Sequence, residues 1–286
     1  MNVRKYILRF TALGYLLVVL LAPLSMVFWR SFDRGAGHLW DSLTNPNTVH
    51  AFKLTLIITV IAVPLNTVFG IVCGIAIVRG RFRGAGIVNA IVDLPLALSP
   101  VVVGLSLFLL YGNTGWFGPT LAEWGIKVLF STPGMILASV FVSLPFVVRE
   151  TVPVLQEIGT EQEQAASTLG ANAWQTFWRV TLPAIRWGVA YGVVLTTARV
   201  LGEFGAVTIV SGSISGQTET LPLFVAKGFE QFDEQAAYAG AIVLALLALT
   251  TLLLMSIGGR KAKASSGPVP DASSLTFTSS TTKEGS

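Results

Sequence analysis

The chain has 286 residues, of which 52% are apolar and only 12% are charged, whereas about 25% of the residues of a soluble domain are charged. This composition is typical of a membrane protein, in which the placement of Lys and Arg around the spans carries more information than the net charge of +4. The basic balance is therefore no sign of nucleic-acid binding. The single Cys73 permits no internal disulfide, and the two histidines, His38 and His50, supply no cluster of metal ligands.

The N-terminus begins like a signal peptide, because Arg4, Lys5 and Arg9 precede an apolar run. That run, from Thr11 to Trp29, has nineteen residues, which is long enough to span a membrane. It ends in bulky side chains and contains no small-x-small cleavage site at its end. We therefore predict an uncleaved first span.

Six apolar runs approach the length of about twenty residues that the hydrocarbon core of a bilayer requires. They are Thr11 to Trp29, Leu54 to Val78, Gly86 to Tyr111, Pro133 to Val148, Trp187 to Val210 and Tyr238 to Ile257. The sequence therefore predicts an all-α membrane protein with six transmembrane helices in a domain formed by residues 1–259.

Four prolines, Pro64, Pro95, Pro100 and Pro145, lie inside these runs. Proline kinks or breaks a helix, and in a membrane the freed backbone groups need partners in neighbouring helices or in a water-filled cavity. The pattern fits packing kinks, and it also fits helices broken along a substrate pathway.

Basic residues indicate the orientation of the spans, because short cytoplasmic loops carry an excess of Lys and Arg. If the termini share one side, that side holds Arg4, Lys5, Arg9, Arg79, Arg81, Arg83, Arg149, Arg179, Arg186, Arg260, Lys261 and Lys263. The opposite side holds Arg30, Arg34, Lys53, Lys127 and Lys227. We therefore predict that both termini are cytoplasmic. The tail at 260–286 is rich in Ser, Thr, Gly and Pro, and we expect it to be disordered and dispensable.

The longest polar interruption, Thr160 to Pro183, lies between the fourth and fifth spans, on the predicted cytoplasmic side. Thr160, with Glu163 three residues later, predicts a capping box at the start of a helix. Gly170 predicts the end of this helix, because glycine readily adopts the left-handed conformation of a C-cap. A short cytoplasmic helix is therefore expected here.

A second short helix is predicted from Ala173 to about Val180. Asn172 and Gln175 repeat the spacing of a capping box. Pro183 then marks the start of the next apolar segment, because proline is favoured in the first turn of a helix.

The fifth span contains two ionisable residues, Arg199 and Glu203. A charge near the centre of a bilayer costs at least a few kcal/mol unless it is paired, and the i,i+4 spacing places both side chains on one helix face. This face is either a structural ion pair or the lining of an anion pathway, in which Arg199 supplies positive potential and Glu203 orients it or acts as a gate. Thr196 and Thr197 add hydroxyl donors to the candidate pathway.

Asp93, in the third span, is a further pathway candidate, although its place before Leu94 and Pro95 favours a cap at a helix start. The spans contain no Ser/His/Asp or Cys/His arrangement, which argues against a membrane-embedded hydrolase. No Gly-Lys-Ser/Thr follows the glycines of residues 112–118, so the sequence offers no nucleotide-hydrolysis site. We therefore predict a non-catalytic subunit without a cofactor or metal.

The polar stretch resembles the EAA loop of ABC-transporter permease subunits, whose pattern is Glu-Ala-Ala, three residues, Gly, nine residues and Ile-x-Leu-Pro. The residues in register are Ala165, Ala166, Gly170, Val180, Leu182 and Pro183. Gln164 stands where the family has Glu, and Glu163 is one place earlier. The resemblance implies that this loop couples the chain to a cytoplasmic ATPase.

The segments 199–206 and 217–222, RVLGEFGA and QTETLP, are similar to those of the oxyanion branch of this superfamily. Up to about residue 259 the chain resembles the sulfate/thiosulfate (CysW-type) permease family of the bacterial inner membrane. The resemblance implies three kinds of partner: a second, homologous permease, two copies of an ABC ATPase, and a periplasmic sulfate/thiosulfate-binding protein.

Three alternatives stay open at this point. A molybdate or tungstate permease would need similar donors for a tetrahedral oxyanion. An ion-coupled secondary transporter could use Arg199 and Glu203 as a charge relay. A membrane anchor or assembly scaffold would explain the spans and the loop, but not an arginine in the middle of a span.

Overall fold

The computed structural model describes residues 2–33, 35–80 and 84–265, and this part of the chain is helical and contains no strand. The helices before the polar stretch that starts at Thr160 are α1 Asn2–Ser31, α2 Ala36–Thr44, α3 Pro46–Arg79, α4 Ala85–Ala97, α5 Pro100–Tyr111, α6 Gly118–Glu123 and α7 Thr132–Ile158. Those that follow are α8 Glu161–Thr168, α9 Ala173–Thr176, the π-helix η1 Phe177–Thr181, α10 Leu182–Leu201, α11 Gly205–Ser211, α12 Leu221–Glu230 and α13 Glu234–Ser265. The all-α prediction is confirmed for the described residues.

The predicted spans correspond to helices, but two of the helices are broken. Four continuous helices are long and apolar enough to cross a membrane, at Arg9–Ser31, Pro46–Arg79, Thr132–Ile158 and Glu234–Thr251. The pair α4 and α5 bends by 108°, and the helix Ala173–Leu201 bends by 53° to α11. Among the described residues there are thus four candidate spans, or up to six if each bent pair is one span, and the count of six stays a prediction.

The break between α4 and α5 has a local cause. Proline disfavours the helical conformation of the residue before it, and Ser99, before Pro100, is extended with ψ 136°. Pro64 and Pro145 instead lie inside the continuous helices α3 and α7. The predicted effect of proline is therefore visible as a break only at Pro100.

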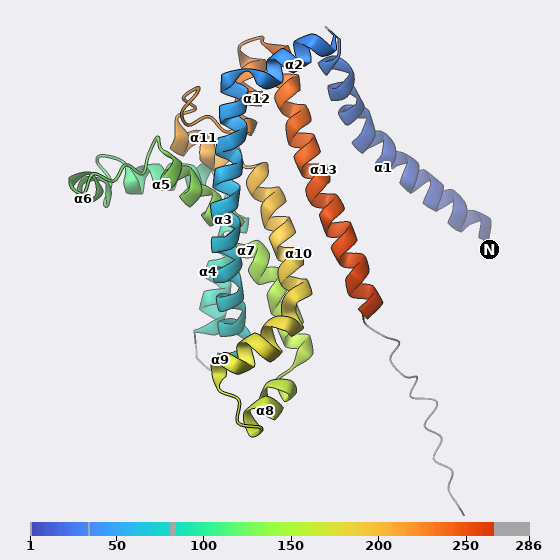
Figure 1. Cartoon of the computed structure of the whole chain (residues 1–286), viewed down its shortest axis with the longest axis vertical. Coiled ribbons are helices and arrows are strands. Elements are labelled where there is room, and N and C mark those ends of the chain that lie inside the picture. Colours follow the sequence, from blue (N-terminus) through green and yellow to red (C-terminus); the bar gives the residue numbers. More distant parts are fainter. Residues whose placement is uncertain (1, 34, 81–83, 266–286) are drawn as a thin grey trace, which may run out of the picture.

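The centre of the molecule is a bundle of α3, α7 and α10 (Figure 1). Glycine allows α3 and α7 to approach closely: a Cβ atom on Gly70 would lie 2.5 Å from the Cβ of Val147, and one on Gly74 would lie 3.2 Å from Cγ2 of Thr151. Small residues favour such close packing in membranes, where the lipid is as apolar as the side chains. A buried core contributed by α3, α5, α7, α10, α11 and α12 consists of Leu54, Ile58, Ala62, Val63, Val103, Leu107, Met135, Ala138, Val142, Val200, Ala206, Val207, Val210 and Leu223.

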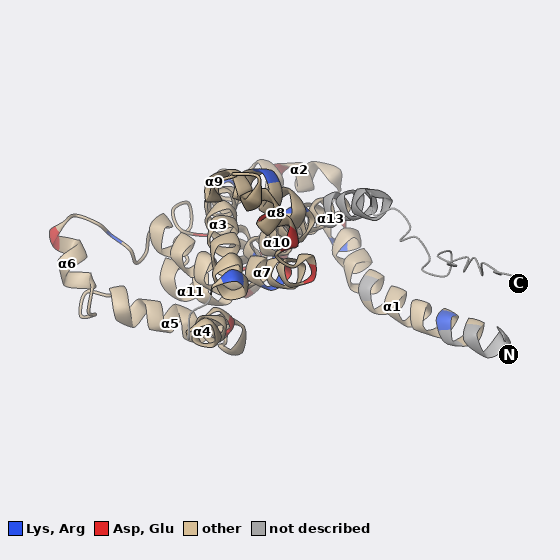
Figure 2. Ribbon diagram, turned by 90° about the horizontal axis from the view of Figure 1, so that it is seen from below, with Lys and Arg blue, Asp and Glu red and all other residues tan. Residues whose placement is uncertain are grey.

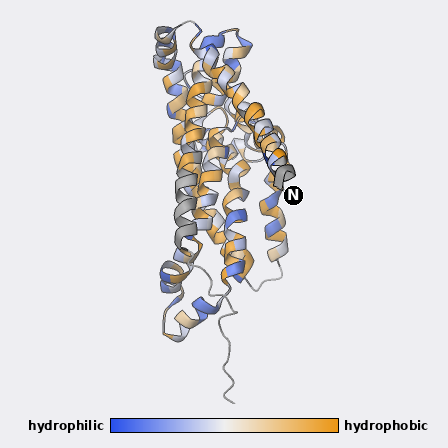
Figure 3. Cartoon of the chain, turned by 90° about the vertical axis from the view of Figure 1, so that its right-hand side faces the viewer, coloured by the Kyte–Doolittle hydropathy of each residue, from blue (hydrophilic) through white to orange (hydrophobic). Residues whose placement is uncertain are grey.

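Polar residues gather at the ends of the long helices, whose middle parts are mostly hydrophobic (Figure 3). Charged residues are sparse along the ribbon, as Figure 2 shows. α8 and α9 lie at one end of the bundle, and α2 and α12 lie near the other (Figure 1). This arrangement fits the predicted topology, although the side of the membrane on which the termini lie stays a prediction.

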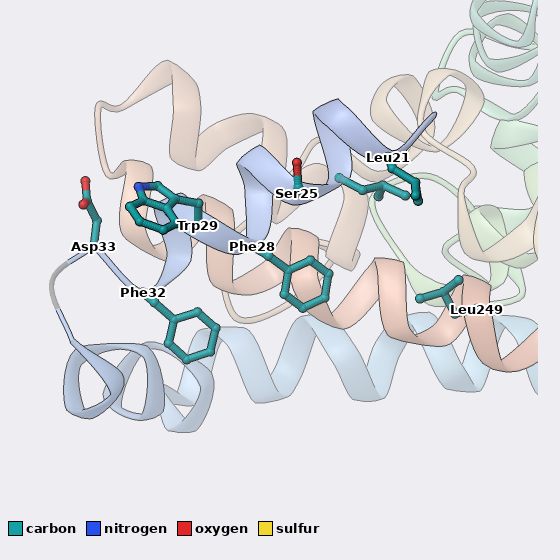
Figure 4. A pocket seen from close by; sticks show the side chains of 8 residues that line it. Leu21, Ser25, Phe28, Trp29, Phe32, Asp33 and Leu249 are labelled. Atoms are coloured by element: carbon teal, nitrogen blue, oxygen red, sulfur yellow. The ribbon is translucent and has the colours of Figure 1, made fainter. Parts of the chain in front are cut away.

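The first helix, α1, contacts α13 and diverges from the central bundle (Figure 1). The two helices border an apolar pocket of about 780 Å³, shown in Figure 4. Its lining residues are Leu21, Leu24, Ser25, Phe28, Trp29, Phe32, Asp33 and Leu249. α1 therefore presents most of its apolar surface outward, as a helix surrounded by lipid or by another membrane subunit does.

At the C-terminus α13 extends to Ser265, past the predicted start of the tail at residue 260. The rest of the predicted disordered tail, residues 266–286, lies outside the described residues. The same is true of three residues of the orientation argument, Arg34, Arg81 and Arg83.

Candidate functional site

The N-terminus of α8 lacks the capping box that the sequence predicts. Thr160 is at the N-cap, but its side chain accepts no hydrogen bond from the backbone; its Oγ1 accepts one from Nε2 of Gln164 at 3.0 Å. The carboxylate of Glu163 lies against Arg79, with Nε to Oε2 at 3.0 Å, and accepts a hydrogen bond from Oγ1 of Thr181 at 2.9 Å. The prediction of a capping box was wrong because a guanidinium from α3 offers this carboxylate a charge-assisted contact.

The C-terminus of α8 ends as predicted at Gly170, whose φ is +86°. The N–H of Gly170 donates to the carbonyl of Ser167, and that of Ala171 donates to the carbonyl of Ala166, each at 3.0 Å. These two bonds form a Schellman motif, which satisfies the last carbonyls of the helix. No atom lies within 4 Å of a Cβ built on Gly170, so the left-handed backbone, and not a lack of space, favours glycine here.

The second capping box is confirmed. The backbone N–H of Gln175 donates to Oδ1 of Asn172 at 2.8 Å, and the N–H of Asn172 donates to Oε1 of Gln175 at 3.0 Å. The helix that follows differs from the prediction, because α9 passes through the π-helix η1 directly into α10. Leu182 and Pro183 are the first two residues of α10 and directly follow the π-helix.

A groove of about 660 Å³ lies between α8 and the start of α10. It is lined by Gln162, Ala165, Ala166, Leu169, Arg179, Val180, Pro183, Ala184 and Arg186. Leu169 is 89% exposed at its edge, and Gln164 is exposed on the same helix. Of the predicted coupling-loop residues, Ala165, Ala166 and Pro183 line this open, largely apolar surface, to which Arg179 and Arg186 add positive charge.

Arg199 and Glu203 form the predicted ion pair, with 2.5 Å between Nη1 and Oε2. They do not share a helix face, because α10 ends at Leu201 and Glu203 lies in the break before α11. The second oxygen of Glu203 accepts the N–H of Ala206 at 2.9 Å. Only 1% of the Glu203 side chain is exposed, against 28% for Arg199, so the pair is closed on the carboxylate side and open on the guanidinium side.

The two threonines before this pair differ in their surroundings. Thr197 donates its hydroxyl hydrogen to the carbonyl of Val193 at 2.7 Å, within its own helix. Thr196 is fully buried. The structure therefore places Thr196 and Thr197 within one turn before Arg199 on α10. Of these three residues only Arg199 carries a charge, and its side chain is partly exposed.

A small cavity of about 10 Å³ lies beside Glu203. Its lining includes the hydroxyl-bearing residues Thr55, Ser139 and Thr220. A volume on the order of one water probe holds a single water molecule and is too small for a tetrahedral oxyanion. This cavity is therefore not an anion site.

Asp93 lies in the interior of α4 and not at a helix start. Its Oδ1 accepts a hydrogen bond from Nε of Arg149 at 2.7 Å, and its Oδ2 contacts a second guanidinium nitrogen of the same arginine. The predicted cap role was wrong because Arg149 of α7, which the sequence analysis used only to orient the spans, binds the Asp93 carboxylate. Asp93 thus joins α4 to α7 in a different ion pair from that of Arg199.

Two further polar contacts were missed at the level of sequence. Arg79 was counted only as a cytoplasmic marker, although it binds Glu163. Glu219, only 2% exposed, pairs with Lys227 at 3.2 Å and accepts a hydrogen bond from Ser215. A carboxylate in the short polar run before Pro222 was the only signal for this second pair. In residues 2–33, 35–80 and 84–265 no group of three or more His, Cys, Asp or Glu side chains could hold a metal ion.

A bundle of long apolar helices, two of them broken, with a capped polar loop at one end, defines a multi-pass helical membrane protein. Residues 66–263 match the family described as the inner membrane component of binding-protein-dependent transport systems, and the chain belongs to this family.

Relatives with high sequence identity align with most of the chain. The sulfate transport system permease protein CysW of Synechocystis is 51% identical over 88% of this chain and 92% of its own length. CysW of Escherichia coli is 45% identical over 84% of this chain and 82% of its own. The sulfate transport system permease protein CysT of Escherichia coli is 40% identical over 86% of this chain and 88% of its own length.

Solved structures share the fold at low identity. A chain of a bacterial alginate ABC transporter in complex with an alginate-bound periplasmic protein gives a TM-score of 0.77 at 20% identity, over 91% of this chain and 95% of the other. A chain of the MetNI methionine ABC transporter gives a TM-score of 0.54 at 20% identity, over 76% of this chain and 94% of the other. These likenesses show a permease fold of ABC importers and say nothing of the substrate.

Proposed function

We propose that this chain is a permease subunit of an ATP-driven ABC importer that carries sulfate or thiosulfate across the bacterial inner membrane. The observation that carries the proposal is the 51% identity to a sulfate transport permease over 88% of the chain. A second permease resembling CysT, two copies of a cytoplasmic ATPase and a periplasmic sulfate-binding protein complete the proposed importer. ATP hydrolysis belongs to the ATPase.

The proposed contact with the ATPase is the groove beside α8. Small side chains at Ala165 and Ala166 leave room for a close approach, and Gly170 turns the chain back towards the bundle. Arg179 and Arg186 at the groove favour an acidic segment of the partner, because opposite charges steer association. Gln164 gives this contact a neutral side chain where the family has a carboxylate.

The proposed contact with the anion is Arg199, flanked by Thr196 and Thr197. The Arg199 side chain is 28% exposed while its carboxylate partner is buried, so an anion approaches it from the open side. The cavity on the closed side has room on the order of one water molecule. The proposed pathway therefore runs between this chain and the second permease, and Glu203 orients the arginine. Asp93 has a structural role in this proposal, because its ion pair with Arg149 holds α4 against α7.

Competition in cells that depend on this importer tests the proposal. Uptake of radiolabelled sulfate should fall when unlabelled sulfate or thiosulfate is added and should persist with an equal amount of molybdate. Stronger inhibition by molybdate or tungstate than by sulfate would show that one of those anions, and not sulfate, is the transported substrate. Copurification of the chain without an ATPase would favour an ion-coupled secondary transporter or a scaffold.

A further inference from the structure

One carboxylate connects three segments at the loop end of the bundle. Glu163 of α8 contacts Nε of Arg79, the last residue of α3, at 3.0 Å, and accepts a hydrogen bond from Thr181 of η1 at 2.9 Å. Arg79 also donates to the carbonyl of Gly159, in the turn before α8. The side chains of Arg79 and Glu163 are only 17% and 23% exposed. The loop is thus attached to α3 through contacts that are partly shielded from water.

These contacts occupy both oxygens of Glu163. A charge-assisted hydrogen bond is about twice as strong as a neutral one, and removing one member of a shielded pair leaves the other charge uncompensated. The carboxylate of Glu163 is therefore bound by residues of its own chain. The neighbouring Gln164 is exposed, and its Nε2 donates to Oγ1 of Thr160 at 3.0 Å.

The helix to which the loop is attached extends to the other end of the bundle (Figure 1). Near its far end, Oγ1 of Thr55 accepts the N–H of Leu221, the first residue of α12, at 2.8 Å. Along its length α3 meets α7 at Gly70 and Gly74, where the helices lie too close for independent movement. A displacement at Arg79 is thus delivered to α7 and α12.

Resting on the proposed function, we propose that Arg79 and Glu163 are positioning residues that transmit the movement of α8 to α3. The ATPase moves α8, and the ion pair makes α3 follow. Glu163 is then an internal connection and not a contact of the ATPase. Thr181 extends the same connection to η1 and α10, so that both α3 and α10 move with the loop.

The test uses the complete complex in proteoliposomes, with Glu163→Gln, Arg79→Gln and the charge swap that combines Arg79→Glu with Glu163→Arg. Glu161→Gln is the matched control, because Glu161 is an exposed carboxylate in the first turn of the same helix. Each single variant should lower sulfate uptake about tenfold, the order expected for a lost charged hydrogen bond, while the ATPase stays bound and continues to hydrolyse ATP. The charge swap should recover part of the uptake, because it restores the ion pair but not the hydrogen bonds to Gly159 and Thr181, and the control should match the wild type.

Hydrogen exchange of residues 160–170 supplies a readout that does not depend on transport. Both single variants should raise exchange in this segment, and the charge swap should lower it again. Loss of the ATPase from Glu163→Gln but not from Arg79→Gln would show that Glu163 is a partner contact and would overturn the inference. Unchanged exchange in either single variant would also overturn it. Failure of the wild type to take up sulfate would instead reject the proposed function, while the exchange result still decides on the ion pair.

Discussion

Glu203 lies beyond the end of α10, yet its carboxylate is 2.5 Å from the guanidinium of Arg199 inside that helix. The break turns the chain so that one carboxylate neutralises the arginine and also accepts the N–H of Ala206 at the start of α11. A charge in a membrane is tolerated when it is paired or faces a cavity, and this arginine has both a partner and an open side. The ion pair therefore stabilises the break and leaves positive potential at its surface.

Replacement of Arg199 tests whether that potential serves transport. Arg199→Gln leaves a buried carboxylate without its counter-charge, which costs about 3–5 kcal/mol. We therefore expect less inserted protein, and uptake per inserted molecule lower by about tenfold, the order of a lost charged hydrogen bond. The measurement is sulfate uptake divided by the amount of chain in the membrane.

The matched variants for this position are Arg199→Lys and the double change of Arg199→Gln with Glu203→Gln. The lysine keeps the charge, and the double change removes the unpaired carboxylate, so both should restore insertion. Only the lysine should restore part of the uptake. Normal uptake per molecule in the double variant would mean that the pair is structural.

A left-handed glycine at the end of α8 gives a second prediction. Gly170→Val places a β-branched side chain at φ +86°, which costs about 1–3 kcal/mol of local strain and disrupts the Schellman turn. We expect normal insertion, because the position is exposed, but ATP hydrolysis that is no longer coupled to uptake. Simultaneous assays of phosphate release and uptake measure this.

Gly170→Asn is the control for that experiment, since asparagine adopts the left-handed region more readily than other residues with a Cβ. It should keep most of the coupling. Full coupling in Gly170→Val would show that the turn is not needed to hold the loop.

The ion pair of Asp93 and Arg149 should matter much less than that of Arg199. The side chains of Asp93 and Arg149 are 25% and 53% exposed, and an ion pair that is this accessible contributes less to stability than a buried one. Asp93→Asn should therefore shift the melting temperature of the purified complex by a few degrees at most and leave uptake nearly unchanged. A loss of uptake comparable to that of Arg199→Gln would place Asp93 in the pathway.

The close contact of α3 with α7 predicts a strong effect of a single methyl group. In Gly70→Ala the new Cβ would lie 2.5 Å from Cβ of Val147, so the helices must separate, at a cost of about 1–3 kcal/mol. Gly86→Ala on α4 is the control, because no atom lies within 4 Å of its added Cβ. Thermal aggregation of the detergent-solubilised chain should occur at a lower temperature only for Gly70→Ala, and equal curves for both variants would contradict the packing argument.

The sequence predicts local features of this fold better than contacts between helices. The glycine at position 170 and the spacing of Asn172 and Gln175 act over a few residues and lead to the expected helix ends, whereas two of the six long apolar runs form broken helices. Glu163 satisfies the same local rule as a capping residue, but Arg79 of a distant helix takes its carboxylate. Asp93 is similar, because its partner Arg149 is 56 residues away and only the folded bundle brings them together.

Breaks in helices were predictable only in part. A proline marks the break before α5, whereas the break after α10 falls at Gly202 and Glu203, which the sequence places inside one continuous apolar run. Glycine alone does not break a helix, and here the carboxylate that accepts the N–H of Ala206 completes the turn. The geometry of the pathway candidate therefore required the structure.

The most direct measurement of the proposed function is sulfate uptake into proteoliposomes that contain this chain, its partner permease and the ATPase, with the periplasmic binding protein added outside. Uptake should require ATP inside the vesicles and the sulfate-loaded binding protein outside, and it should be independent of any ion gradient. Uptake that follows an imposed proton or sodium gradient without ATP would contradict the assignment to an ABC importer.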